Sequence, residues 1–163
     1  MRHVLVAALL ALSASSSPAV AQTTPPAPTD RTKATVFTAE DLAAALARLP
    51  ADRPSGAARV FTLAPYNVNV EQRQPRQQGA SMHEVQAEFF YVIEGSATLL
   101  TGGTLTSPTR TGTNLAGPGI EGGVRQRFKK GDFMIVPSGV PHQFVDITAP
   151  VHLLQIYLPN APQ

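Results

Sequence analysis

The residues of this chain that could bind a metal ion are concentrated in two short segments. Residues 81–88 read SMHEVQAE, with His83 and Glu88 five positions apart and Ser81 two positions before the histidine. Residues 131–142 read GDFMIVPSGVPH and end at His142. Imidazole nitrogens and carboxylate oxygens are common ligands of divalent metals, so the first question is whether the fold brings these side chains together.

Strand geometry limits how the first segment can form a site. Residues two apart in a strand face the same side, so Ser81 and His83 should share a face. His83 and Glu88 are separated by an odd interval, and one uninterrupted strand would point them apart. We therefore expect a turn or a bulge at residues 84–87, followed by a buried strand in the run FFYVI that begins after Glu88.

Strand-like runs separated by glycine and proline predict an all-β fold. The runs are ARVFTLA, YNVNVEQ, EFFYVI, ATLLT, VRQRF, DFMIV, HQFVD and VHLLQIYL. Such a series is typical of an antiparallel sandwich or barrel, and the roughly 110 residues that it occupies can enclose one core. The sequence indicates neither a second domain nor an internal repeat at a fixed period.

The two segments together resemble the paired motifs of the cupin superfamily. The first family motif has the form H-x-H-x(3,4)-E-x(6)-G, and the matching positions here are Ser81, His83, Glu88 and Gly95. The second has the form G-x(5)-P-x-G-x(2)-H-x(3)-N, and the matching positions are Gly131, Pro137, Gly139, His142 and Asp146, the last where asparagine is usual. The resemblance covers about residues 59–158. In the second motif, the matching positions lie at the family's fixed intervals.

The resemblance implies a small jelly-roll β-barrel of the single-domain, cupin_2-like type with a metal site inside it. By position, His83, Glu88 and His142 would bind a divalent ion such as iron, manganese, zinc or nickel. Two histidines and one carboxylate are also a set that non-haem iron uses with open coordination positions. Ser81 stands where the family has its first histidine; since a hydroxyl is a poor ligand, it would line the cavity or hold a water. Cupins commonly dimerise through sheet edges, which implies a homodimer here.

Three functions remain open, because one fold hosts many chemistries. The first is a metal-dependent enzyme of dioxygenase, isomerase or lyase type that acts on a small molecule. The second is a non-enzymatic protein that binds a small ligand, and the third is a metal-free degenerate cupin whose barrel serves only as a scaffold for interactions. A carboxylate that precedes FFYVI would be buried, and a metal would neutralise its charge; the alternative is that Glu88 is an exposed edge residue. Few other acid–base groups are present, and Glu84, in the expected turn, should face solvent.

The first 21 residues have the pattern of an export signal. Arg2 and His3 precede the apolar run VLVAALLAL, and Ala19-Val20-Ala21 is a small-residue cleavage site before Gln22. Nine apolar residues are too few for a transmembrane helix, which needs about 20. We expect a periplasmic or secreted protein, the alternative being an N-terminal anchor that stays in place.

Charge and cysteine content exclude several classes of partner and chemistry. Without residues 1–21 the chain loses Arg2, and its net charge falls from +2 to +1. This balance does not favour nucleic acid or an anionic membrane as a partner, and a small molecule is the expected ligand. The chain has no cysteine, which excludes disulfides, thiolate chemistry and a lipoprotein anchor.

Outside the expected barrel, composition predicts a linker and a short helix. Residues 22–36 include the Pro- and Thr-rich sequence QTTPPAPTDRTK and are expected to be a disordered linker. A short helix is expected over residues 37–50, with Thr38 as its cap and Asp41 in the capping-box position. Residues 101–123 are rich in Gly, Thr and Pro, and such a long segment is either a lid or rim loop or a floppy insertion.

Several other residues have simpler expected roles. His152 alternates with Leu154 and Ile156 and is expected in the core or at the rim. The basic residues Arg125, Arg127 and Lys129 alternate along one run, as in a solvated edge strand that charges protect from pairing. Asp146 is expected in a turn or behind the metal ligands. The expected core wall consists of Phe90, Val92, Phe133, Ile135, Phe144 and Tyr157.

Overall fold

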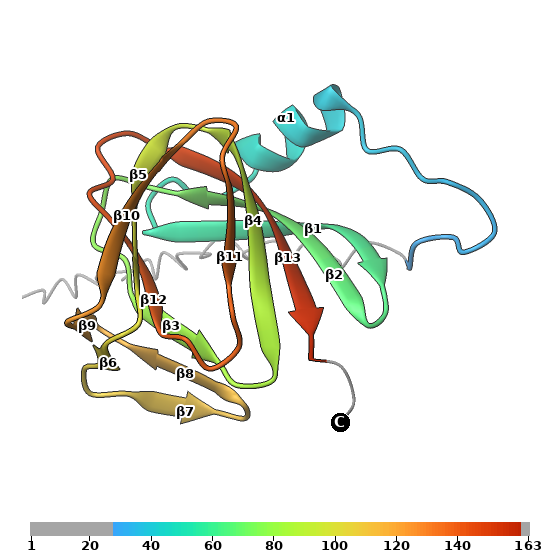
Figure 1. Ribbon diagram of the computed structural model, residues 1–163. Helices are drawn as coiled ribbons and strands as arrows, with labels where there is room; N and C mark the ends of the chain where they lie inside the picture. Colours follow the sequence, from blue (N-terminus) through green and yellow to red (C-terminus); the bar gives the residue numbers. More distant parts are fainter. Residues whose placement is uncertain (1–27, 161–163) are drawn as a thin grey trace, which may run out of the picture.

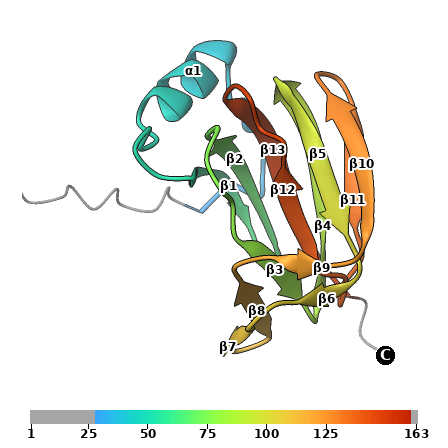
Figure 2. The ribbon, with the colours of Figure 1, turned by 90° about the vertical axis from the view of Figure 1, so that its left-hand side faces the viewer.

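The computed structural model describes residues 28–160, so the predicted export signal and the first part of the predicted linker lie outside the described residues. Two antiparallel sheets face each other (Figures 1 and 2). The first has the order β1-β2-β13-β4-β11 and the second the order β10-β5-β12-β3-β8-β7, while β6 and β9 form a small separate pair. The expected all-β fold with one short N-terminal helix is confirmed.

The element bounds follow the runs expected from the sequence. The first sheet contains β1 (Ser55–Leu63), β2 (Tyr66–Arg73), β4 (Gln86–Glu94), β11 (Phe133–Val136) and β13 (Val151–Pro159). The second contains β3 (Ala80–His83), β5 (Ser96–Thr101), β7 (Thr109–Thr111), β8 (Asn114–Gly117), β10 (Val124–Lys129) and β12 (His142–Val145). The small pair is β6 (Thr104–Leu105) with β9 (Ile120–Glu121).

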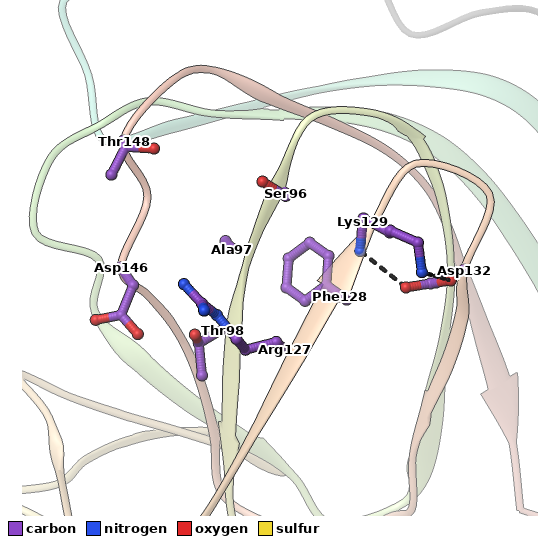
Figure 3. Close-up of a pocket in the computed structure, with 9 residues that line it drawn as sticks. All are labelled: Ser96, Ala97, Thr98, Arg127, Phe128, Lys129, Asp132, Asp146 and Thr148. Carbon is purple, nitrogen blue, oxygen red and sulfur yellow. Dashed lines mark hydrogen bonds and ion pairs between the residues drawn. The ribbon is translucent and has the colours of Figure 1, made fainter.

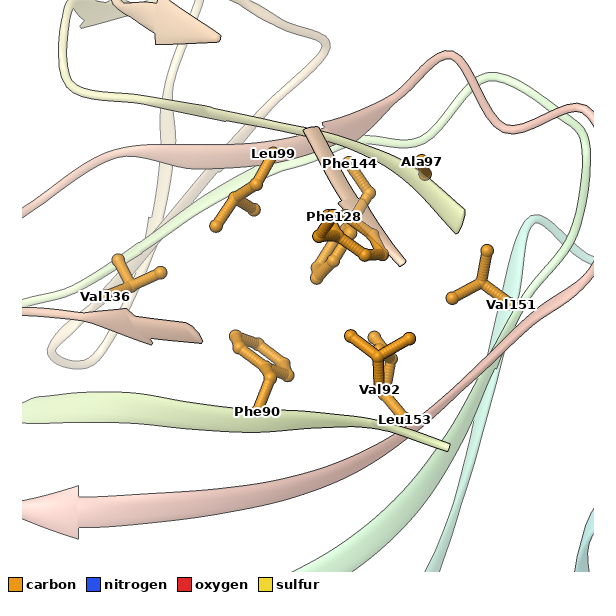
Figure 4. Packing of buried hydrophobic residues seen from close by; sticks show 9 residues of the cluster. All are labelled: Phe90, Val92, Ala97, Leu99, Phe128, Val136, Phe144, Val151 and Leu153. Carbon is orange, nitrogen blue, oxygen red and sulfur yellow. The ribbon is translucent and has the colours of Figure 1, made fainter. Parts of the chain in front are cut away.

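The hydrophobic core fills the space between the sheets beside the candidate site (Figure 4). Alternation along β4 places Phe90 and Val92 in this core, on the same face as Glu88. Phe144 of β12 meets Phe90 and Phe128 edge-on, with ring centroids 5.4 Å and 5.8 Å apart. Burying each such side chain contributes about 1.5–3 kcal/mol, so the core fixes the strands that hold the site.

The N-terminal helix α1 (Ala39–Ala47) lies against β2 outside the barrel. Its capping box is the expected one: the Thr38 hydroxyl accepts from the Asp41 amide, and the Asp41 carboxylate accepts from the Thr38 amide. The helix is shorter than the predicted 37–50. Arg48 and Leu49 continue the chain in a tighter turn, because the amide of each donates to the carbonyl of the residue three positions earlier.

The predicted linker, residues 22–36, has two hydrogen bonds to the sheet at its described end. Residues 28–36 form no helix or strand, but the Thr29 amide donates to the Thr62 carbonyl at 2.9 Å and the Thr62 amide donates to the Thr29 hydroxyl at 3.1 Å. These bonds attach the segment to the free edge of β1, which is the outermost strand of its sheet. Residues 22–27 lie outside the described residues.

The segment 101–123 is not a floppy insertion. It contains β6, β7, β8 and β9, and β8 extends the second sheet by pairing with β3. The pairing sets Ser81 opposite Ala116 and His83 opposite Asn114. The segment therefore belongs to the sheet that presents the candidate site.

Two residues of the expected core wall are on the surface. Phe133 and Ile135 of β11 have exposed fractions of 68% and 60%, whereas Val136 is buried. Because side chains alternate along a strand, only one face of β11 meets the core. Phe133 instead packs outside the sheet on Tyr91, with ring centroids 5.0 Å apart.

Within residues 28–160, no helix is both long and apolar enough to cross a membrane.

Candidate metal centre

A turn at residues 84–85 brings His83 and Glu88 to one place, as the odd spacing predicted. His83 ends β3 and Glu88 lies in β4, so the two residues belong to opposite sheets. The amide of Gly139 donates to the His83 carbonyl at 2.8 Å, and the amide of Asn160 donates to the Val85 carbonyl at 3.1 Å. Both ends of the turn are thus tied to distant parts of the chain.

A second turn delivers His142 to the same place. The Val140 amide donates to the Pro137 carbonyl at 3.2 Å, and Gly139, third in this turn, has φ +75°. A positive φ at the third turn position favours glycine, which explains the Pro-x-Gly spacing. His142 then begins β12, between β5 and β3 in the second sheet.

The structure brings His83, Glu88 and His142 together inside the barrel. One ligand atom from each side chain lies within 4.8 Å of the other two. Glu88 Oε2 is 2.7 Å from His142 Nε2 and 3.3 Å from His83 Nε2. The side chains of Glu88 and His142 are 3% and 6% exposed, and that of His83 is 14% exposed, so access from solvent is on the His83 side.

The carboxylate of Glu88 has one oxygen without a hydrogen-bond partner. Oε2 is buried, and although it lies close to two imidazole nitrogens, neither contact has hydrogen-bond geometry. Burial alone would raise the pKa of Glu88, but the contacts with His142 and His83 outweigh it and hold this pKa far below its ordinary value. The carboxylate is therefore ionised, and one ligand atom from each of the three side chains converges on the same point. Such an arrangement fits a divalent cation.

Neighbouring polar groups fix the orientation of each candidate ligand. His83 Nδ1 is 2.8 Å from Asn114 Oδ1, and His142 Nδ1 is 3.4 Å from the Val140 carbonyl. With Nδ1 facing an oxygen in both rings, Nε2 is the atom turned toward Glu88. Metal-binding histidines in proteins are commonly held this way.

Glu88 is held from behind by a chain of buried amides. Gln155 of β13 donates from Nε2 to Glu88 Oε1, and its Oε1 accepts from Asn69 Nδ2 of β2 at 2.7 Å. Gln155 and Asn69 are both buried. The amide of Gln155 occupies Glu88 Oε1, so Glu88 Oε2 is the free ligand atom. Neither amide was expected as a site residue from the sequence.

Ser81 faces the side of the sheet on which the candidate ligands lie. It is directly opposite His142 in the β3–β12 pair and shares the strand face of His83. Directly paired residues project their side chains to the same face, so the expected inward orientation of Ser81 agrees with the register. Its neighbour across β12 is Thr101 of β5, also opposite His142.

A second buried carboxylate, Glu71, also faces the barrel interior. Arg73 donates from Nη2 and Nε to Glu71 Oε2 at 2.7 Å and 3.2 Å, and its guanidinium lies 4.7 Å from the ring centroid of Phe144 in the core. Sequence reasoning missed Glu71. The signal was the alternation of Asn69, Glu71 and Arg73 with valines along β2.

Tyr157 completes the wall beside the candidate ligands. It is paired with Glu88 across β13 and β4, and its ring meets His83 edge-on with centroids 5.3 Å apart. Burial and the nearby Glu88 carboxylate raise the pKa of Tyr157 well above its ordinary value. The phenol is therefore neutral and available as a hydrogen-bond donor beside the site.

The other polar residues singled out in the sequence lie away from the centre. His152 faces outward on β13, because the buried Leu153 beside it faces the core, and burial lowers the pKa of His152. Asp146 is an exposed residue directly after β12, with φ +57°, and is paired with Arg125. β10 is an edge strand, as its alternating basic residues predicted. A groove of about 350 Å³ lies over β5 and β10, and Lys129 Nζ is 3.7 Å from Asp132 Oδ1 there. Figure 3 shows the residues that line it.

A larger cavity of about 720 Å³ opens between the edges of the two sheets, at β10 and β11. Its lining includes the apolar side chains of Leu99, Phe128, Met134 and Val140, the neutral polar side chains of Thr101 and Gln126, and the charged side chains of Arg127 and Asp132. None of the three candidate ligands lines it. Its wall nevertheless ends next to His142, because Thr101 is paired with His142 and the Val140 carbonyl faces the His142 ring.

Comparisons with known proteins support the fold. No protein-family model and no curated protein matches the chain. An uncharacterised conserved protein with a double-stranded β-helix domain from Klebsiella pneumoniae subsp. pneumoniae is similar over 68% of this chain and 81% of its own, with TM-score 0.50 and 18% identity. The chain has the double-stranded β-helix fold of cupins.

Two further solved structures are similar over comparable lengths. The Schizosaccharomyces pombe Cnp3 cupin domain matches 66% of this chain with TM-score 0.47 and 15% identity, and less than two thirds of that chain, 63%, is covered. A Cupin 2 conserved barrel domain protein from Salinispora arenicola matches 69% of this chain and 82% of its own, with TM-score 0.45 and 21% identity.

Proposed function

We propose that this protein binds a divalent metal ion through His83, Glu88 and His142 and uses the site to bind or transform a small molecule. The observation that carries the proposal is Glu88 Oε2, a buried oxygen of an ionised carboxylate that has no hydrogen-bond partner and lies 2.7 Å and 3.3 Å from two imidazole nitrogens. An uncompensated buried charge is costly, and a cation at this point would compensate it.

The residues around the site support such a role. Gln155 occupies Oε1 of Glu88 and so presents Oε2 alone, while Asn114 and the Val140 carbonyl turn the two Nε2 atoms toward it. Ser81, with a weakly binding hydroxyl, leaves room where the cupin motif has a further histidine. A metal with three protein ligands keeps open positions and would supply Lewis-acid or oxygen-activating chemistry to a bound molecule. Iron, manganese, zinc and nickel all fit this ligand set.

A small molecule with both apolar and polar groups is the ligand that the surroundings favour. The cavity of about 720 Å³ beside Thr101 has the size of small-molecule sites in proteins and is lined by both apolar and polar side chains. The neutral phenol of Tyr157 is placed to donate a hydrogen bond to a polar group near the metal. A dioxygenase, isomerase or lyase would use these features for turnover, and a non-enzymatic binding protein would use them for recognition.

A metal-free degenerate cupin is the competing proposal. In that protein the imidazole of His83 would carry a proton that neutralises Glu88, and the cluster would be structural. The raised pKa of His83 favours this state when no metal is bound: burial alone would lower it, but contacts with Glu88 and Asn114 outweigh burial. Metal binding and protonation are thus alternatives at the same atoms.

We also propose that the protein acts outside the cytoplasm, in the periplasm or as a secreted protein. The support is the pattern of residues 1–21, with the apolar run from Val4 and the Ala19-Val20-Ala21 cleavage site.

Metal titration of the chelator-treated protein tests the proposed site. We expect binding of one divalent ion per chain by calorimetry, and strong loss of binding in His142→Ala. His152→Ala is the matched control, because His152 lies on the outer face of β13 and should leave affinity unchanged. Equal binding by the wild type and His142→Ala would contradict the site, and no binding of iron, manganese, zinc or nickel by the wild type would favour the metal-free protein.

A further inference from the structure

The β7–β8 hairpin, residues 109–117, contacts the metal-binding turn at three points. It is built for a tight reversal: Thr111 pairs with Asn114, and the two residues between them form the turn. Gly112, the first of these, has φ +60°, which hairpin turns of the primed types require. The turn therefore places Thr113 and Asn114 at a fixed position beside the end of β3.

The first two contacts hold the backbone and side chain of Glu84, the residue after His83. The Glu84 amide donates to the Thr113 carbonyl at 3.0 Å. Arg110 of β7 donates from Nη1 and Nη2 to the two oxygens of Glu84, at 2.6 Å and 2.9 Å. This ion pair is exposed, so its own contribution is small. Its geometric effect is to orient the hairpin on the turn.

The third contact acts on His83 itself. Asn114 Oδ1 lies 2.8 Å from His83 Nδ1, and Asn114 is also the residue directly opposite His83 in the β3–β8 pair. An amide oxygen accepts a hydrogen bond and cannot donate one, so the proton of the neutral ring belongs on Nδ1. Nε2 then has its lone pair directed at the point where Glu88 Oε2 and His142 Nε2 converge.

We propose that Asn114 is a positioning residue that selects the metal-binding tautomer of His83, and that the β7–β8 hairpin exists to hold it there. The inference rests on the proposed metal site, to which it adds the role of a segment that carries no ligand. Water could replace Asn114 as an acceptor, because Asn114 is exposed. Unlike water, the amide is fixed by strand pairing and by the Arg110–Glu84 pair, and so it orients the ring.

Two measurements on Asn114→Ala test this role. In the metal-free protein, nitrogen NMR of the neutral His83 ring should show the Nδ1–H tautomer in the wild type and a shift toward Nε2–H in Asn114→Ala, since Nε2–H can donate to Glu88. Titration of the chelator-treated proteins with Co²⁺, followed by visible absorption, should show affinity about 10–100-fold lower in Asn114→Ala, as for other groups behind metal ligands. Asn114→Asp keeps an acceptor at this position and should restore both the tautomer and most of the affinity.

Two further variants separate positioning from general damage to the hairpin. Thr109→Ala changes an exposed residue of β7 on the far strand and should alter neither measurement. Arg110→Ala removes the exposed ion pair but leaves the acceptor, and should lower affinity by no more than about fivefold.

The outcomes distinguish this inference from the proposed function. If the wild type binds Co²⁺ and Asn114→Ala has the same affinity and the same tautomer, the role of Asn114 is overturned and the metal site stands. If the wild type binds no metal, the proposed function fails, and the tautomer decides the inference: a shift in Asn114→Ala supports the positioning role, and an unchanged ring overturns it. An Nε2–H tautomer in the wild type also overturns it.

Discussion

Ser81 lies directly opposite His142 in the β3–β12 pair, so the residue that replaces the usual first histidine of the cupin motif faces the candidate ligands. Ser81→His should therefore add a fourth protein ligand and tighten metal binding by about tenfold or more, comparable to the effects of groups around a metal. It should also fill a coordination position and weaken any reaction that needs the substrate on the metal.

Metal titration of both proteins after chelation measures this change. Met82→His is the matched control, because Met82 neighbours Ser81 but projects to the opposite face of β3. Equal metal affinities of Ser81→His and the wild type would show that residue 81 does not reach the metal.

The buried amide chain behind Glu88 gives a second prediction. Gln155→Leu leaves Glu88 Oε1 and Asn69 Nδ2 without their partners, which should destabilise the metal-free protein by about 1–3 kcal/mol for each unsatisfied group. Because Glu88 also loses its fixed orientation, metal affinity should fall about 10–100-fold. Urea denaturation and metal titration measure the two effects separately.

Gln78→Leu is the control for Gln155→Leu. Gln78 is buried and donates to the carbonyls of Pro54, Gln74 and Arg76, outside the candidate site. Its replacement should cost comparable stability without changing metal affinity. A Gln155→Leu protein that is destabilised but binds metal as the wild type does would rule out an orienting role for Gln155.

Glu71 and Glu88 allow the same chemical change at two buried carboxylates. Glu88→Gln should abolish most metal binding, because it removes the charge at the convergence point. Glu71→Gln should leave metal affinity unchanged, because Arg73 already occupies Glu71 Oε2 and Glu71 is not among the converging ligands. It should cost about 1–3 kcal/mol of stability, because the largely buried Arg73 guanidinium keeps its charge and loses the opposite charge of its partner. Calorimetric titration of both variants checks this, and loss of binding in Glu71→Gln would enlarge the site.

Local geometry explains why much of the site could be predicted. The turn between His83 and Glu88 follows from an odd interval in strands, and the placement of His142 follows from the spacing of Pro137 and Gly139. Both are short-range features that a few residues determine. The strand runs and the helix cap were predictable for the same reason.

Features that depend on distant contacts could not be predicted. Alternation along β2 defines a polar and an apolar face but does not show which face is inward. In the structure the polar face with Glu71 is inward. Val70 lies on the outward face, where α1 packs, and is 2% exposed. Likewise, Phe133 is exposed because the pairing of β11 with β4 turns it, with Tyr91, to the outer face of the sheet. Asn114 acts on His83 only because β8 pairs with β3. The Thr-Gly-Thr-Asn turn was the one local signal for that hairpin.

Export gives a prediction that is independent of the site. If signal peptidase cleaves after Ala19-Val20-Ala21, the mature protein should begin at Gln22. Intact mass and N-terminal sequencing of the protein from the periplasm or medium measure this. Recovery of residues 1–21 on the protein in a membrane fraction would contradict the proposed localisation.

The His–Glu–His cluster should make the stability of the metal-free protein depend on pH in a definite direction. The pKa of His83 is raised above its ordinary 6.5, so its stabilising contribution is complete below pH 6.5 and is lost as the pH rises through the raised value. The pKa of Glu88 is lowered from 4.5, so its contribution is present above pH 4.5 and is lost as the pH falls through the lowered value. The cluster should therefore stabilise the metal-free fold most between about pH 4.5 and 6.5.

Comparison of the wild type with Glu88→Gln isolates this contribution. The pKa of His152 is lowered, so its contribution to stability changes with pH in the opposite direction and is present in both proteins. The stability difference between the wild type and Glu88→Gln removes this contribution and should decline from pH 6 to pH 8. Bound metal should reverse the trend, because His83 and His142 must be deprotonated to bind it, and the gain in Tm on metal addition should grow over the same range. Thermal unfolding with and without metal measures both. A difference that rises from pH 6 to pH 8 without metal would show that Glu88 does not depend on an imidazolium partner.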